Sequence, residues 1–299
     1  MVNTWSTPLI IEAAISPLRV LGETQVFTTE ELIQQARSCF AVGAGIVHHH
    51  HDFALDVAGT ADEMMRFGQG VLATYPHALF YGDYVNASAF DEKMGHLPVL
   101  EQSNTLRMIA VDPGVASFGG LDDDGLPFTL FTPWTTFEEA NRLADYAKRI
   151  GVPLSVGVFE PGMLRWAVAQ ARRNGLPAGS LVKLYLSGDR DPFRPNRAAF
   201  NAGLPPTPAA IEVLLEMLGD CGLPWQVSVL GGVIHEMPLA RYVIEKGGHI
   251  RTGVEDAGGL TDATNAECVS AVQAIAEAAG RPVVTGADVL RTLKGEMTE

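Results

Sequence analysis

"TTEELIQQARSCFAVGAGIVHHHH", residues 28–51, contains one complete helix-to-strand unit. Thr28 or Thr29 is a typical helix N-cap, and a glutamate follows in the first turn, where its carboxylate can complete a capping box. The pattern predicts a helix that stops at Gly43. The next run, residues 45–51, has apolar residues ahead of the histidines and predicts a strand. This stretch therefore indicates an α/β protein.

The same alternation recurs along the chain. Candidate strands lie at residues 9–15, 45–51, 78–85, 106–112, 153–159, 181–187, 225–231 and 249–254. Candidate helices include residues 28–43, 136–151, 207–222, 236–248 and 265–280. Most of these strands are continuously apolar, as buried parallel strands are. Roughly eight such units predict one (β/α)₈ TIM-barrel domain over residues 1–299. The alternative is an open doubly wound sheet, although no strand is followed by a GxGxxG motif.

Composition limits the classes of function. The chain has 299 residues, 47% of them hydrophobic, and a formal net charge of −14, so an acidic surface argues against nucleic acid as a partner. The three cysteines form no CxxC pair, which is typical of reduced thiols in a cytoplasmic protein. We see neither a signal peptide nor a run of about 18 apolar residues, so no membrane association is expected.

Four consecutive histidines lie at the end of the second candidate strand. Strand alternation places His48 and His50 on one face and His49 and His51 on the other. A barrel's active site lies where its strands end, so a pair of imidazoles there is suited to a metal ion. The alternative is that some of these histidines are packed core or loop residues.

The segment "KGGHIRTGVEDAGG", residues 246–259, covers the last candidate strand. Arg251 and Glu255 share a face of that strand if it continues through them, and Asp256 begins the loop. The last strand of a closed barrel neighbours the first, so Glu255 could complete a His₂Glu metal site. Asp256 could then serve as a base whose pKa Arg251 depresses. The alternative is an Arg–Asp surface pair at a helix entry.

Taken together, these motifs resemble the β-keto acid cleavage enzyme family, whose founding activity is 3-keto-5-aminohexanoate cleavage. "GAGIVHHHHD" is followed about 200 residues later by "GGHIRTGVED". Further similarity lies in "FEPGML", residues 159–164, and in the stretch from "TNAECVSAV" to "DVLRTL", residues 264–293. The resemblance extends over nearly the whole chain.

The resemblance implies a role for each matching residue. The family's zinc ligands fall on His48, His50 and Glu255, its catalytic aspartate on Asp256 and the partner arginine on Arg251. The family's conserved carboxylate after the fifth strand falls on Glu160, and we expect Glu160, Asp83 and Ser117 to bind the substrate. The two other histidines, His49 and His51, are not expected to be ligands.

The resemblance also implies a reaction. A β-keto acid binds zinc, Asp256 takes a proton from acetyl-CoA, and the resulting enolate attacks the keto carbon. Coenzyme A then migrates, so acetoacetate leaves together with a new acyl-CoA. Another divalent transition metal would also suit these ligands. The family further implies a homotetramer.

Two loops depart from the family pattern. Asp83 and Tyr84 stand where the family usually has an asparagine followed by small hydroxyl residues. After the fourth strand, Gly114-Val115 replaces a glycine followed by serine or threonine. Two other functions therefore stay open: a metal-dependent hydrolase or CoA-independent lyase, and a non-catalytic barrel that binds keto acids.

Overall fold

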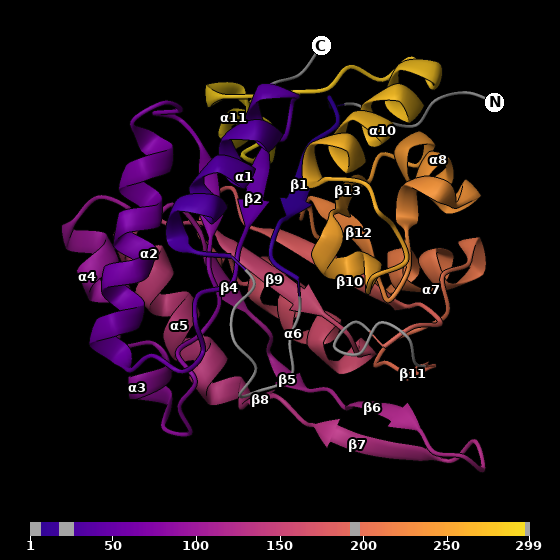
Figure 1. The fold of residues 1–299 in the computed structure, drawn as a ribbon, viewed down its shortest axis with the longest axis horizontal. Helices are drawn as coiled ribbons and strands as arrows, with labels where there is room; N and C mark the ends of the chain where they lie inside the picture. Colours follow the sequence, from indigo (N-terminus) through magenta and orange to yellow (C-terminus); the bar gives the residue numbers. More distant parts are fainter. Residues whose placement is uncertain (1–6, 18–26, 192–197, 297–299) are drawn as a thin grey trace.

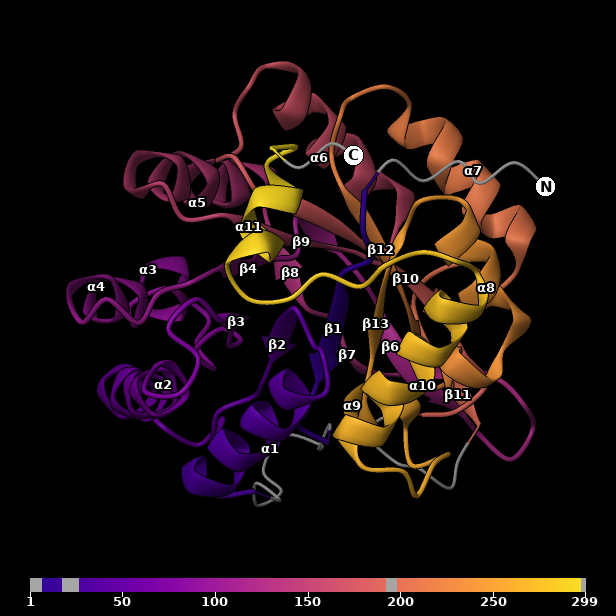
Figure 2. The ribbon, with the colours of Figure 1, turned by 90° about the horizontal axis from the view of Figure 1, so that it is seen from above.

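Eight parallel strands form a nearly closed barrel with helices around it (Figures 1 and 2). The structure is a computed structural model and describes residues 7–17, 27–191 and 198–296. The barrel strands are β1 (Ile11–Ala14), β2 (Ile46–His48), β3 (Leu79–Tyr81), β4 (Ile109–Val111), β9 (Leu154–Val158), β10 (Leu181–Ser187), β12 (Trp225–Leu230) and β13 (His249–Thr252). Their order is β3-β2-β1-β13-β12-β10-β9-β4, which confirms the predicted TIM barrel.

Helices surround the outer face of the sheet (Figure 2). The longer ones are α1 (Thr29–Ala41), α2 (Val57–Leu72), α5 (Phe137–Ile150), α6 (Pro161–Arg172), α7 (Pro208–Leu218), α8 (Pro238–Glu245) and α10 (Asn265–Ala278). The shorter ones are α3 (Phe90–Lys93), α4 (Leu97–Gln102), η1 (Ile234–Glu236), α9 (Val254–Ala257) and α11 (Ala287–Leu293). The expected single domain of residues 1–299 also includes residues outside the described ranges and stays a prediction.

Threonine caps begin several helices, as their sequences predict. Thr28, rather than Thr29, is the N-cap of α1, and Glu31 completes its capping box. The same box begins α5 at Thr136 and α10 at Thr264. Because the threonine and the glutamate each satisfy an orphan backbone amide, these boxes mark helix starts that can be read from sequence.

The barrel interior is apolar at one end and charged at the other. Ile10, Ile46, Leu79, Met108 and Leu181 form the apolar end together with side chains of α11. Nearer the carboxyl ends of the strands, the interior buries polar and charged side chains, among them Glu12, Lys183, Gln226 and Arg251. Burying charge is costly unless the groups pair with one another, so the polar end identifies the functional end of the barrel.

An excursion after β4 was not predicted. It contains β5 (Gly114–Val115), β6 (Phe118–Leu121), β7 (Pro127–Phe131) and β8 (Trp134–Thr135), and β6 also pairs with β11 (Ala199–Phe200). Figure 1 shows the β6–β7 hairpin projecting from the barrel. Its short strands and exposed apolar side chains, such as Leu126 and Phe128, lack the alternation that marks a strand in sequence.

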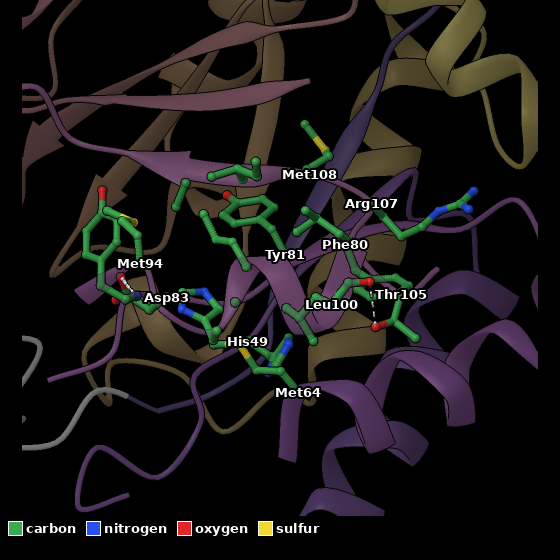
Figure 3. Close-up of a pocket in the computed structure, with 17 residues that line it drawn as sticks. His49, Met64, Phe80, Tyr81, Asp83, Met94, Leu100, Thr105, Arg107 and Met108 are labelled. Atoms are coloured by element: carbon green, nitrogen blue, oxygen red, sulfur yellow. Dashed lines mark hydrogen bonds between the residues drawn. The ribbon is translucent and has the colours of Figure 1, made fainter. Parts of the chain in front are cut away.

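The seam between β3 and β4 holds a pocket (Figure 3). Side chains from both strands and from α2 and α4 line it, including His49, Met64 and Leu100. These two strands are the ends of the pairing order, which explains why the space opens here. None of the helices in the described part of the chain is long and apolar enough to cross a membrane.

Candidate metal and acid–base site

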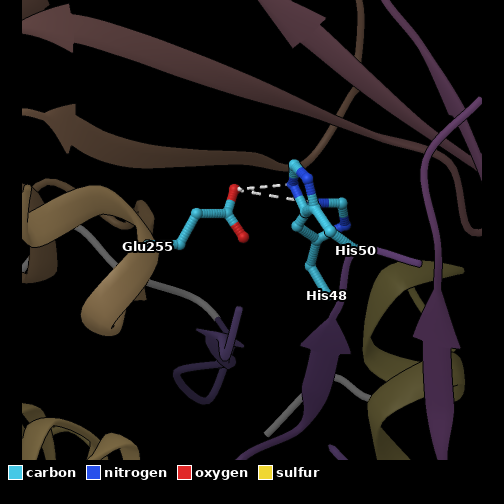
Figure 4. Close-up of side chains that lie close together, drawn as sticks. All are labelled: His48, His50 and Glu255. Atoms are coloured by element: carbon cyan, nitrogen blue, oxygen red, sulfur yellow. Dashed lines mark ion pairs between the residues drawn. The ribbon is translucent and has the colours of Figure 1, made fainter. Parts of the chain in front are cut away.

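Three buried side chains converge at the carboxyl end of the barrel (Figure 4). His48 ends β2, His50 follows two residues later, and Glu255 lies in α9. The Nε2 atoms of His48 and His50 lie 3.5 and 3.4 Å from Oε1 of Glu255. Ligand atoms of all three lie within 4.8 Å of one another, and no other such group of three or more occurs among the described residues.

The other two histidines of the run lie on the opposite side of the strand, as alternation predicts. The ring of His49 stacks on Phe67 of α2, with centroids 3.8 Å apart. His51 packs against Phe53, with ring centroids 4.8 Å apart. Burial lowers the pKa of His49 to about 3 and that of His51 to about 2, so both are neutral. His49 therefore packs between the barrel and α2, and His51 packs against the loop that follows β2.

Glu255 reaches the site by a different route from the one expected. The predicted strand covered residues 249–254, and its continuation would have placed Arg251 and Glu255, four residues apart, on one face. In the structure, β13 ends at Thr252. Gly253 then adopts a φ of 140°, and a Cβ there would lie 2.2 Å from the carbonyl oxygen of Ala14. Only glycine suits this close approach. The chain turns into α9, which brings Glu255 and Asp256 back over Arg251.

Arg251 links the carboxylates of the site. It is almost completely buried, and its guanidinium donates to Glu12, Glu255 and Asp256. The Nη1–Oε1 distance to Glu12 is 2.9 Å, and the Nη2–Oδ1 distance to Asp256 is also 2.9 Å. Burial opposes a charge on Glu255, but Arg251 and His50 outweigh it and hold the pKa of Glu255 below its ordinary value. This interior therefore keeps Glu255 ionised.

The direction of the pKa shift at Asp256 corrects our expectation. Arg251 does lower the pKa of this carboxyl, as predicted, but burial has the larger effect and raises it above the ordinary value. Asp256 also accepts a hydrogen bond from Ser228 on β12. A raised pKa makes the carboxylate a stronger base, so the shift suits proton abstraction better than the predicted one.

Further members of this polar end were missed by the sequence analysis. Glu12 on β1 accepts from the hydroxyl of Tyr81 at 2.5 Å and from Nε2 of Gln226 at 2.7 Å. Tyr81 in turn accepts from Nζ of Lys183 at 2.6 Å. The available signal was a charged residue inside an otherwise apolar strand, as in "LIIEAAI" and "LVKLYLS". A buried charge of this kind requires partners.

The three expected substrate-binding residues occupy different places. Asp83, just after β3, has Oδ2 3.9 Å from Nε2 of His50, so it borders the metal-ligand group. Glu160 is partly buried at the N-cap position of α6, without a capping hydrogen bond from its side chain. Ser117 is exposed between β5 and β6. The role of each stays a prediction.

Two neighbouring residues also face this end of the barrel. Asp112 follows β4, and its backbone N–H donates to the hydroxyl of Tyr84 at 2.7 Å. Burial raises the pKa of Asp112 to about 6, against the influence of Lys183. Its carboxylate lies over Gly157 of β9, where a Cβ would meet Oδ1 at 1.9 Å. The altered loops after the third and fourth strands therefore supply polar groups beside the site.

The three converging side chains fit a metal ion. Oε2 of Glu255 and Nδ1 of His48 are buried without a hydrogen-bond partner in the structure. Burial, Arg251 and His50 hold the pKa of His48 well below its usual range, so its imidazole is neutral, as a ligand must be. Two imidazoles and a carboxylate form a donor set that leaves coordination positions open for a substrate.

Comparison with known proteins gives consistent matches over the chain's length. A model of the β-keto acid cleavage enzyme family matches residues 8–294. The 3-keto-5-aminohexanoate cleavage enzyme of Acetoanaerobium sticklandii is 25% identical over 295 residues, which cover 95% of this chain and 97% of that protein. The 3-oxoadipate:acetyl-CoA acetyltransferase of Cupriavidus necator is 24% identical over 300 residues, covering 96% of this chain and 95% of that protein.

A solved structure is similar in fold. The binary complex of ObcA with oxaloacetate aligns with a TM-score of 0.62 at 17% sequence identity. The alignment covers 91% of this chain and 67% of that one. At this identity the likeness extends to the fold alone.

Proposed function

Because the chain belongs to the β-keto acid cleavage enzyme family, we propose that it transfers an acyl group between a β-keto acid and acetyl-CoA with the help of zinc. Cleavage of a β-keto acid is the activity that the family match and its relatives support. The observation that carries the metal is the convergence of His48, His50 and Glu255 beside Asp256. The acetyl-CoA acetyltransferase relative supports a CoA thioester as co-substrate.

His48, His50 and Glu255 would hold the metal. Zinc suits this donor set, although manganese, cobalt, nickel or iron would also be accepted by it. When bound, such an ion supplies Lewis acidity to a substrate carbonyl oxygen. The buried position of the three ligands excludes water from their outer sides, which strengthens their electrostatic interaction with a bound ion.

Asp256 is the proposed general base. Its carboxylate is buried and accepts hydrogen bonds from Arg251 and Ser228, so the orientation of its oxygen atoms is fixed. It would accept a proton from the methylene carbon of the β-keto acid rather than from acetyl-CoA, because only the enolate of the keto acid leads to acetoacetate. Arg251 would stay charged throughout and stabilise the ionised carboxylate before that transfer.

The bonds balance without an oxidant or a reductant. The methylene carbon of that enolate forms a bond to the thioester carbon of acetyl-CoA, and the CoA thiolate then leaves this carbon and adds to the keto carbon of the β-keto acid. The bond between the keto carbon and the methylene carbon then breaks, and the methylene carbon, which now carries the acetyl group, takes back the proton from Asp256. The products are acetoacetate and a new acyl-CoA.

The remaining assignments are part of the same proposal. Asp83, Glu160 and Ser117 would contact the substrate, with Asp83 nearest the metal-ligand group. We also propose one domain over residues 1–299, a homotetramer and a cytoplasmic location.

Purified protein loaded with zinc should be assayed against a panel of β-keto acids, with and without acetyl-CoA. We expect acetoacetate and a new acyl-CoA in equal amounts, only when acetyl-CoA is present. Cleavage without acetyl-CoA would favour the hydrolase or lyase instead. Keto acid binding without turnover under either condition would favour a non-catalytic barrel.

A further inference from the structure

Lys183 is a buried cation that the proposed reaction does not use. It lies in the middle of β10 and is 3% exposed. Its Nζ lies 4.7 Å from the ring centroid of Tyr81 and 5.4 Å from that of Tyr185. Removing an ammonium from water is costly, and two ring faces offset only part of that cost. The hydrogen bonds of the Lys183 ammonium must therefore offset the rest of the cost of its burial.

The chemistry of the donors fixes the direction of the hydrogen bonds. An ammonium has no lone pair, so Lys183 must donate to the hydroxyl oxygen of Tyr81, 2.6 Å away. The single proton of that hydroxyl then points to Oε1 of Glu12, 2.5 Å away. Without Lys183, the hydroxyl would lose the donor that holds it in this orientation.

Glu12 connects Tyr81 to Arg251 through hydrogen bonds. Its Oε1 accepts from Tyr81 and from Nη1 of Arg251, and its Oε2 accepts from Gln226. Three donors therefore hold the carboxylate. Since Nη1 of Arg251 is held by Glu12, its Nε and Nη2 are aimed at Asp256, with distances of 3.0 and 2.9 Å to Oδ2 and Oδ1.

We propose that Lys183 is a positioning residue for the proposed reaction: through Tyr81 and Glu12 it holds Arg251, and so orients the carboxylate of Asp256. The role rests on the proposed function. Among the described residues, no hydrogen bond joins Lys183 to Asp256 directly, so the hydrogen-bonded route from Lys183 to Arg251 runs through Tyr81 and Glu12.

The kinetic test is a double-mutant cycle of Lys183→Met and Tyr81→Phe, measured with saturating zinc. Each single variant should lower kcat about 10- to 100-fold, since each loses a hydrogen bond involving a charged group. The KM for the keto acid should change less than kcat. If Lys183 acts through Tyr81, the double variant should lie within about twofold of Tyr81→Phe alone. Multiplicative losses would mean that Lys183 acts through its charge or packing, and would overturn the proposal, as would a wild-type kcat in Lys183→Met.

Ser155→Ala is the matched control. Ser155 is fully buried on the neighbouring strand β9, and its hydroxyl has no hydrogen-bond partner in the structure. Its removal deletes a buried polar atom of the barrel without breaking this chain of hydrogen bonds. We expect kcat within about twofold of wild type, because distant sites without shared partners are independent.

A crystal structure of Lys183→Met gives a readout that does not depend on activity. We expect the Tyr81 hydroxyl to leave Glu12 and the contact between Arg251 and Asp256 to change. Unchanged positions of these side chains would overturn the proposal, even if wild-type protein showed no keto acid cleavage. If Lys183→Met does not fold, the structure of Tyr81→Phe replaces it: Glu12 and Arg251 should move, and their retention in place would contradict the account.

Discussion

The inward and outward sides of the histidine run contain the same residue type in different surroundings. His48 and His50 face a carboxylate and an arginine inside the barrel. His49 stacks on Phe67 of α2, and His51 packs against Phe53 in the loop after β2. One residue along the strand therefore separates a potential ligand from a packing residue.

The two sides also treat charge differently. On the outward side, burial keeps His49 and His51 neutral, with few charges to oppose it. On the inward side, burial also disfavours a charged His50, but Glu255 and Asp83 outweigh it and raise the pKa of His50. A positive charge is therefore stabilised at His50, whereas the neighbouring His48 stays neutral, and the carboxylates beside His50 would also favour a metal ion.

Glu255→Gln should have the largest effect on the inward side. The amide keeps the side chain's shape but removes the negative charge, so we expect metal affinity to fall more than about 100-fold, beyond the loss typical of outer partners alone. Zinc titration with a competing chelator measures this. His77→Gln, at an exposed position, is the control and should bind zinc as wild type does.

Asp256→Asn should separate catalysis from metal binding. The variant loses the basic oxygen, so we expect kcat to fall at least about 100-fold, as for a lost general base. Zinc and keto acid binding should be retained, which calorimetry on the same preparation would measure. Residual activity above about a tenth of wild type would remove Asp256 from the proposed mechanism.

His49→Ala and His50→Ala compare the two sides directly. Loss of the stacked His49 ring should lower the free energy of unfolding by about 2–4 kcal/mol, as for other large-to-small core changes, with zinc content near wild type. His50→Ala should lose zinc. Denaturant unfolding and elemental analysis of both variants provide the readout. Loss of zinc in His49→Ala would reverse the assignment of the two faces.

His96 is another buried histidine outside the metal-ligand group, and it should make the protein less stable in acid. Burial lowers the pKa of His96 to about 4, whereas an unfolded histidine has a pKa of about 6.5. The unfolded state therefore binds a proton that the folded state excludes between these values, and stability present above pH 6.5 is lost as the pH falls toward 4. The loss from this group should be on the order of 3 kcal/mol.

Unfolding measured from pH 7 down to 4 in wild type and His96→Leu checks this window. We expect a shallower loss of stability in the variant, and an unchanged loss in His77→Gln. The same slope in His96→Leu and in wild type would mean that other groups cause the loss in acid.

Sequence reasoning found the parts of the site that follow local periodicity. Alternation along one strand separated His48 and His50 from His49 and His51, and the barrel rhythm predicted that β13 lies beside β1. It did not find the turn at Gly253, because a φ of 140° is a property of the folded backbone and leaves only a glycine in the sequence. Glu255 was therefore selected correctly as a neighbour of the histidines, but on a strand rather than on α9.

Long-range partners explain most of what sequence reasoning missed. Tyr81 is 69 residues from Glu12 and 102 residues from Lys183, so no local pattern joins them. Only the closing of the barrel places these three side chains in one interior. The β5–β8 excursion was missed for another reason, since its strands are as short as two residues and carry no periodicity.

Anomalous diffraction from zinc-soaked crystals tests the central claim most directly. We expect one strong peak between the Nε2 atoms of His48 and His50 and the carboxylate of Glu255, at distances of about 2.0–2.2 Å from each ligand atom. The Glu255→Gln crystal, soaked in the same way, should lose that peak. A peak beside His49 or His51, or none within reach of Glu255, would contradict the account.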